Sequence, residues 1–115
     1  MINQDILEET LEILLNVVES LKELRRDNFD ERIDFITSAF NHMQDNVIKE
    51  ELIKDSNIGV NELLKRIKRN MAMFTRLSLA DVNIQNYIDR KPMLINWVSY
   101  YVKQVDTYLK NGRTL

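Results

Sequence analysis

The sequence contains no cysteine, one proline and two glycines in 115 residues. Without cysteine, the chain cannot form disulfides, thiolate nucleophiles or cysteine-ligated zinc and iron–sulfur sites. So few prolines and glycines argue against a turn-rich β-sandwich or barrel and against long flexible linkers. Glycine occurs only at positions 59 and 112, which excludes glycine-rich phosphate loops and the Gly-x-Ser-x-Gly nucleophile motif.

Histidine is nearly absent as well, because His42 is the only one. One histidine without cysteine cannot build a typical zinc site. A di-iron carboxylate bundle needs Glu-x-x-His on two helices, and here Ala39 stands three residues before the single histidine. No serine has a histidine in a plausible helical register. The sequence therefore predicts a protein that is not an enzyme, with no catalytic residues, no metal and no cofactor, and with His42 on the surface.

Long apolar runs are also missing, since no stretch approaches the ~18 uncharged apolar residues of a membrane span. The first residues are acidic, whereas a secretory signal begins with basic residues. Together with the lack of cysteine, these features predict a cytoplasmic protein that does not interact with membranes.

The number and the spacing of the apolar residues predict a single helical domain over residues 1–115. Apolar residues make up 44% of the chain, which is enough for one core at this length. They recur at alternating spacings of three and four, the period of a helix with one buried face. The pattern predicts an all-α antiparallel four-helix bundle with helices near 4–26, 28–54, 61–77 and 92–110.

Capping residues and proline set the predicted helix boundaries. Asn28 is expected to cap the second helix, and Pro92 to open the last one, where its fixed φ and missing N–H are tolerated. Ser78 and Asp81 resemble a capping box, which favours a short extra helix at about 79–89. The alternative, in which residues 77–91 prolong the third helix, stays open. The residues expected to be most buried are Leu14, Val18, Ile36, Phe40, Ile67, Met71, Trp97 and Tyr101.

The first and last helices each carry more apolar surface than one neighbour covers. Beside its main stripe, each has a second apolar row, and a helix in a closed bundle buries an arc only a little over ~100° wide. Large exposed apolar patches are rare on soluble monomers, so the surplus predicts a homodimer. Periodicity does not decide which row forms the interface. The candidate rows are Ile6, Ile13, Val17 and Leu24 on the first helix, and Ile95, Val102 and Leu109 on the last.

Charge is divided unevenly along the chain. Residues 1–60 have a net charge of −8 and residues 61–115 a net charge of +6. Either the two halves attract each other, or the basic half binds a polyanion or an acidic partner. The candidate basic interaction face lies on the third helix and consists of Lys65, Arg66, Lys68, Arg69 and Arg76. On the first helix, Glu8 and Glu12 lie four residues apart with no cation beside them, a repulsion that a partner or solvent can relieve.

These features favour a non-enzymatic protein-interaction or regulatory module that binds a protein partner through its helix faces. The alternative is a nucleic-acid-binding protein that uses the basic face of the third helix for phosphate contacts. Aromatic residues that could stack on bases are missing from that face, and a true nucleic-acid binder is usually basic overall.

Overall fold

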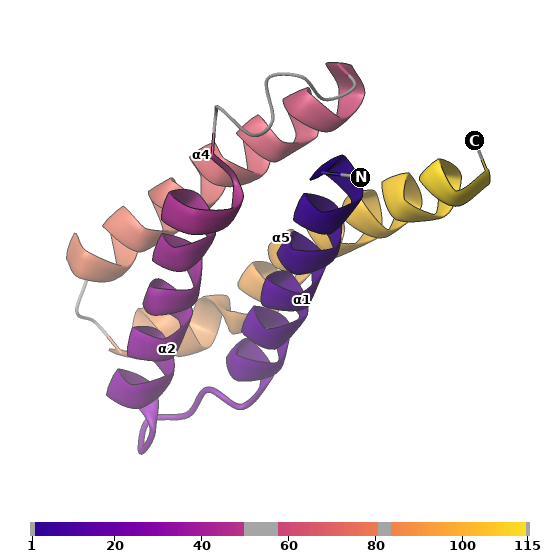
Figure 1. Ribbon diagram of the computed structural model, residues 1–115. Helices are drawn as coiled ribbons and strands as arrows, with labels where there is room; N and C mark the ends of the chain where they lie inside the picture. The colour runs from indigo at the N-terminus through magenta and orange to yellow at the C-terminus, as the bar shows by residue number, and fades with distance from the viewer. Residues whose placement is uncertain (1, 50–57, 81–83, 115) are drawn as a thin grey trace.

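The computed structural model describes the backbone of residues 2–49, 58–80 and 84–114, and the side chains of residues 4–49, 58–74 and 84–111. Every regular element in these ranges is helical, which confirms the all-α prediction. The elements are α1 (Ile2–Lys22), α2 (Phe29–His42), the π-helical turn η1 (Met43–Val47), α4 (Ile58–Ala80) and α5 (Ile84–Thr114). Figure 1 shows α1 alongside α5, with α2 and α4 on the other side of the bundle.

The helix pair α1 and α2 forms an antiparallel hairpin. Near the connecting turn, the Arg32 guanidinium lies 2.9 Å from the Glu23 carboxylate. Far from the turn, His42 Nε2 lies 3.7 Å from the Glu9 carboxylate. Later residues of α2 thus meet earlier residues of α1, as the predicted up-and-down bundle requires.

Two contacts align α4 antiparallel to α2. The rings of Phe40 and Phe74 meet edge to face with centroids 5.2 Å apart. Further along α2, after η1, Lys68 Nζ donates a hydrogen bond to the Ile48 carbonyl oxygen at 3.1 Å. The Lys68 ammonium thereby satisfies a carbonyl at the end of the α2–η1 helix, where the helix dipole favours positive charge.

The last helix, α5, lies antiparallel to α4. The Trp97 ring stacks on Phe74 with centroids 6.2 Å apart. One turn further along α5, Tyr101 Oη accepts a hydrogen bond from the Asn70 side-chain amide. This pairing accounts for the polar end of a tyrosine whose ring is buried in the core.

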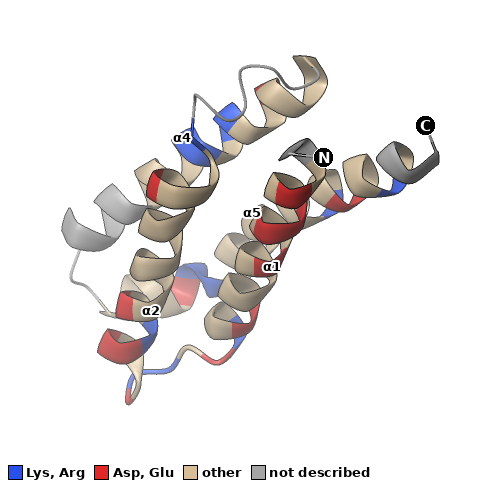
Figure 2. Cartoon of the chain, viewed as in Figure 1, with Lys and Arg blue, Asp and Glu red and all other residues tan. Residues whose placement is uncertain are grey.

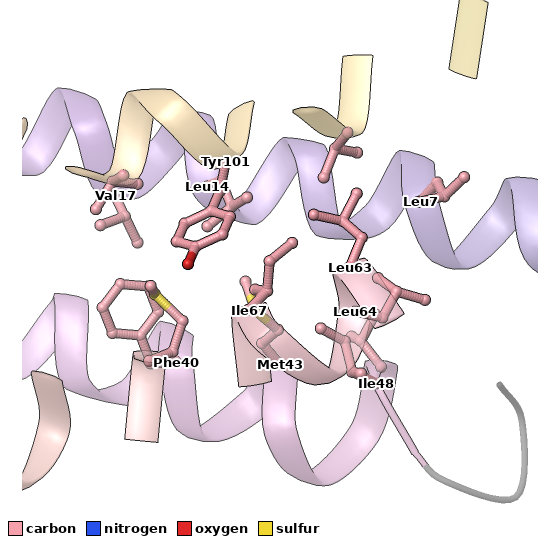
Figure 3. Close-up of a cluster of buried hydrophobic side chains, with 14 of the residues drawn as sticks. Leu7, Leu14, Val17, Phe40, Met43, Ile48, Leu63, Leu64, Ile67 and Tyr101 are labelled. Atoms are coloured by element: carbon pink, nitrogen blue, oxygen red, sulfur yellow. The ribbon is translucent and has the colours of Figure 1, made fainter. Parts of the chain in front are cut away.

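The predicted core is confirmed for seven of its eight residues. Leu14, Ile36, Phe40, Ile67 and Met71 are almost completely buried, and Val18 and Tyr101 are buried as well. Figure 3 shows such side chains from all helices converging between α1 and α2. Trp97 is only partly buried and packs against the edge of this core.

The boundaries of the later helices differ from the prediction. The backbone of α4 continues without a break through Ser78 to Ala80, and residues 84–91 form the first turns of α5. Among the described residues there is therefore no separate short helix at 79–89, because residues 79–80 belong to α4 and residues 84–89 to α5. The last helix begins before Pro92 rather than at it. Residues 81–83, through which the alternative would prolong the third helix, lie outside the described residues. The second helical segment ends with η1 at Val47, so Ile48 and Lys49 are not helical as predicted. The remaining part of the predicted range, residues 50–54, lies outside the described residues.

A long-range contact explains why the helix continues through Pro92. A proline inside a helix removes one backbone hydrogen bond. Tyr87, one and a half turns earlier, packs edge to face on Phe29 with centroids 5.5 Å apart, and both rings join Leu24 in a second apolar cluster. Burial of Tyr87 holds the first turns of α5 against the α1–α2 corner and offsets the lost bond, while the Pro92 ring faces solvent.

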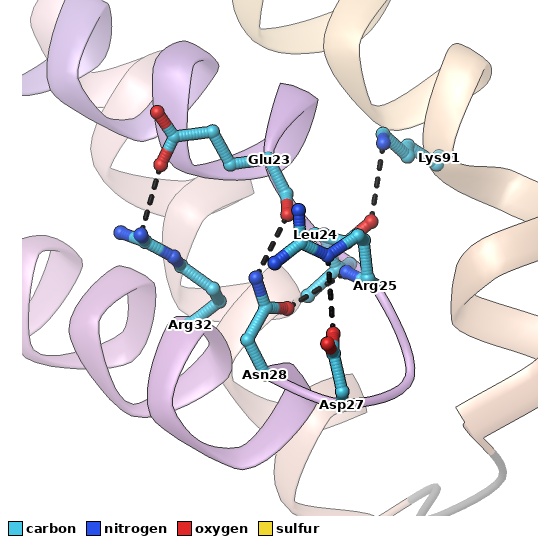
Figure 4. Close-up of polar contacts among 7 residues, drawn as sticks. All are labelled: Glu23, Leu24, Arg25, Asp27, Asn28, Arg32 and Lys91. Atoms are coloured by element: carbon cyan, nitrogen blue, oxygen red, sulfur yellow. Dashed lines mark hydrogen bonds and ion pairs between the residues drawn. The ribbon is translucent and has the colours of Figure 1, made fainter.

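Asn28 occupies the N-cap position of α2, as predicted, but its side chain closes the turn between α1 and α2. Its side chain makes no capping bond to α2. Instead, Asn28 Oδ1 accepts a hydrogen bond from the Arg25 backbone N–H at 2.8 Å, and Nδ2 donates to the Glu23 carbonyl oxygen at 2.9 Å (Figure 4). The amide therefore stabilises the end of α1, because a carbonyl and an N–H left there need partners.

Candidate functional site

An open groove of about 390 Å³ lies between the first half of α1 and the last turns of α5. Because α5 is antiparallel to α1, its C-terminal turns lie beside the N-terminal turns of α1 (Figure 1). The groove is lined by Glu8, Leu11, Glu12, Leu15, Asn16, Asp106, Leu109 and Lys110.

The floor of the groove is apolar. Leu109 is buried, Leu11 is partly buried, and Leu15 leaves 47% of its surface exposed. Leu15 follows Leu11 by four residues and therefore lies one turn along the same side of α1. α5 leaves this edge of the apolar face of α1 open. Leu15 does not belong to the second apolar row that predicted a homodimer, so it is further apolar surface of α1 that reaches solvent.

The rim of the groove is acidic. Glu8 and Glu12 are exposed on one turn of α1, and Glu8 accepts a hydrogen bond from the Gln4 amide at 3.2 Å. Across the groove, Asp106 pairs with Lys110, whose Nζ lies 2.9 Å from its carboxylate. Three carboxylates and one ammonium leave the rim negative. The repulsion between Glu8 and Glu12 inferred from the sequence thus falls at the edge of an apolar groove.

The lining of the groove combines leucines with three carboxylates, one amide and one lysine. It contains no histidine, serine or threonine. His42 lies on α2, exposed, with Glu9 and Asn46 as its polar neighbours, in agreement with the surface position expected for it. The described residues contain no group of three or more acidic, histidine or cysteine side chains placed to hold a metal ion.

The predicted basic face of α4 divides into two parts. Lys65, Arg66 and Arg69 are exposed, and within the described part of the chain none of them forms an ion pair. Lys68 is half-buried and bonded to the Ile48 carbonyl, so it supports the fold. The side chain of Arg76 lies outside the described residues. Figure 2 shows basic positions on α4 and acidic ones along α1.

The apolar rows proposed for a homodimer are largely packed inside one protomer. On α1, Ile6, Val17 and Leu24 are buried, and Ile13 is partly buried. On α5, Leu109 is buried, and Ile95 and Val102 are partly buried and pack against the core. These side chains belong to the two apolar clusters of the single protomer, although periodicity alone assigned them to a partner. A homodimer stays a prediction, but little of either row remains for its interface.

The two oppositely charged halves of the chain are not joined by ion pairs among the described side chains. The long-range polar contacts between the halves pair cations with neutral groups: Lys68 with the Ile48 carbonyl, Lys91 with the Leu24 carbonyl, and Arg26 with the Gln85 amide. Among the described side chains, these contacts between the two halves are therefore hydrogen bonds to neutral groups rather than ion pairs.

Comparison of the chain with protein-family models, with curated proteins and with solved structures found no match. Within the described ranges, none of the helices combines the length and the apolar character that crossing a bilayer requires. Among the described residues, the α1–α5 groove joins apolar and acidic side chains, and the exposed face of α4 is basic.

Proposed function

We propose that the chain is a non-enzymatic protein-interaction module, with a regulatory role through the partner it binds, and that the partner docks in the groove between α1 and α5. The observation that carries the proposal is Leu15, a large apolar side chain that is 47% exposed in a concave site with an acidic rim. Helical partners commonly bury apolar side chains in grooves between two helices. The acidic rim adds a preference for partners with basic residues beside their apolar ones.

The absence of cysteine supports placing this interaction in the cytoplasm, where thiols are kept reduced and disulfides contribute little. This location is part of the proposal and rests on composition.

A photo-crosslinking amino acid at position 15 tests the proposal in the native cell. We expect crosslinks from position 15 to a protein, and their loss when E8K/E12K reverses the charge of the rim. The matched control places the same crosslinker at Asp34, an exposed position on α2 away from the groove. Equal crosslinking from both positions, or none from position 15, would contradict the proposal.

Nucleic-acid binding is the second candidate function. It is favoured by the exposure of Lys65, Arg66 and Arg69 on one helix, without ion pairs to other described side chains. Phosphate contacts of this kind release counterions, so binding should weaken steeply as salt increases. Retention on a DNA or RNA column at low salt, lost in K65E/R69E, would support this candidate. Free passage of the wild-type chain at low salt would exclude it.

A further inference from the structure

The groove presents one short row of side chains along α1. Glu8 and Glu12 lie four residues apart, which is about 6 Å along a helix axis, and Leu15 follows after about 4.5 Å. The two carboxylates are exposed and Leu15 is 47% exposed. The row therefore consists of two negative charges followed by an apolar side chain, along one edge of the groove.

The outward face of α4 carries a row of similar length, about 12 Å against about 10.5 Å, with the opposite charge. Lys65, Arg69 and Met73 follow one another at spacings of four residues, or about 6 Å per step. Lys65 and Arg69 are exposed, and Met73 is 47% exposed, as Leu15 is. A methionine adapts its unbranched side chain to an apolar surface more readily than a β-branched residue does.

We infer that the groove of one copy binds the outward face of α4 of a second copy. With the two helices side by side in the same direction, Lys65 faces Glu8, Arg69 faces Glu12, and Met73 covers Leu15. This inference rests on the proposed function, because it names the occupant of the same groove. Charge complementarity between two exposed surfaces of one chain is the observation that selects a second copy over an unrelated partner.

This mode of assembly differs from the two-fold dimer expected from the apolar rows. The groove and the face of α4 are different patches, so the contact between them is heterologous. Heterologous contacts join protomers head to tail and lead to rings or open chains. The complex is therefore not limited to two copies. If the copies do not close into a ring, the number of copies in a complex increases with protein concentration.

Salt dependence of the molecular mass gives the first test. The Debye length is about 30 Å at 10 mM salt and about 3 Å at 1 M salt, so exposed ion pairs act fully only at the lower value. By sedimentation, we expect species of at least about twice the 13.7 kDa monomer mass at low salt and monomer at high salt. A monomer at both salt concentrations, in the range of hundreds of micromolar protein, would overturn the inference.

Mixing two variants with reversed charge, one in the groove and one on α4, tests whether these two surfaces bind each other. E8K/E12K and K65E/R69E should each be monomeric, because each variant has two like-charged faces. Mixed in equal amounts, they should associate again, because each supplies the face that the other needs. All four positions are exposed, so the fold should be kept, and E8Q/E12Q checks the groove without adding positive charge.

A matched control separates specific pairing from an effect of net charge alone. D30K/D34K also reverses two exposed acidic residues one turn apart, but on α2. It changes the net charge of the chain by the same amount as E8K/E12K and leaves both the groove and the α4 face unchanged, so it should self-associate as the wild type does. A D30K/D34K variant that becomes monomeric as E8K/E12K does would overturn the inference.

The crosslinker at position 15 distinguishes failure of the inference from failure of the proposed function. Crosslinks to residues 65–73 of a second copy support both. Crosslinks only to other proteins contradict the inference and leave the proposed function standing. No crosslink from position 15 contradicts both.

Discussion

The ammonium of Lys91 on α5 donates a hydrogen bond to the Leu24 carbonyl oxygen just beyond α1, at 3.1 Å (Figure 4). The two residues are 67 positions apart in the sequence, so the bond ties the start of α5 to the turn that follows α1. The carbonyl lies past the last turn of α1, where helix carbonyls lack intrahelical partners and positive charge is favourable.

Replacing Lys91 with methionine should therefore lower the free energy of unfolding by about 1 kcal/mol. Methionine keeps most of the length and apolar surface of the lysine stem and removes the donor. Chemical denaturation followed by circular dichroism measures the change. K103M is the matched control, since Lys103 is exposed on the same helix, and an equal loss in both variants would contradict the role assigned to Lys91.

Replacing Asn28 with alanine should cost about 1–2 kcal/mol, because it removes two hydrogen bonds to the backbone that close the α1–α2 turn. N28D should cost part of this amount. Its carboxylate still accepts from the Arg25 N–H but cannot donate to the Glu23 carbonyl. D27A is the control, since the exposed Arg25–Asp27 pair contributes little. If N28A and D27A unfold at the same denaturant concentration, the turn is not held by Asn28.

Replacing Phe40 with alanine should cost on the order of 3–5 kcal/mol, the range for removing a buried aromatic ring. Phe40 is completely buried and contacts Phe74 from α4. F35A is the matched control on the same helix, because Phe35 leaves 46% of its surface exposed, and it should cost much less. Similar losses of stability in the two variants would show that the ring of Phe40 does not lie in the core.

The core could be predicted from the sequence because the helical period is local: side chains three and four residues apart share a face whatever else the chain does. The burial of Phe40 and Ile67 can be predicted in this way. The continuation of α5 through Pro92 could not be predicted, because it depends on the packing of Tyr87 against Phe29, 58 positions away in the sequence. From its sequence neighbours alone, a proline after a polar stretch favours the start of a helix. Only the tertiary contact of Tyr87 with Phe29 overrides that preference.

The candidate site could be predicted only in part from the sequence, for the same reason. The pair Glu8 and Glu12 indicated an acidic edge, since helix spacing alone brings them together. That Leu15 stays exposed beside α5 while Val17 is buried in the core depends on how helices far apart in the sequence pack. Periodicity gives the width of an apolar face and not the neighbour that covers it.

Glutamate substituted separately for Leu15 and for Val17 tests whether the first lies in the groove and the second in the core. Leu15 lies in the groove and is 47% exposed, whereas Val17 is completely buried between α1 and the rest of the bundle. L15E should change the free energy of unfolding by no more than about 0.5 kcal/mol, as surface substitutions usually do. V17E places a carboxylate in the core without a partner and should cost several kcal/mol, about the penalty for an unpaired buried polar group or more. Thermal unfolding of both variants measures the difference. A V17E chain that stays as stable as the wild type and loses only its self-association would mean that Val17 lies at an interface between copies rather than inside one.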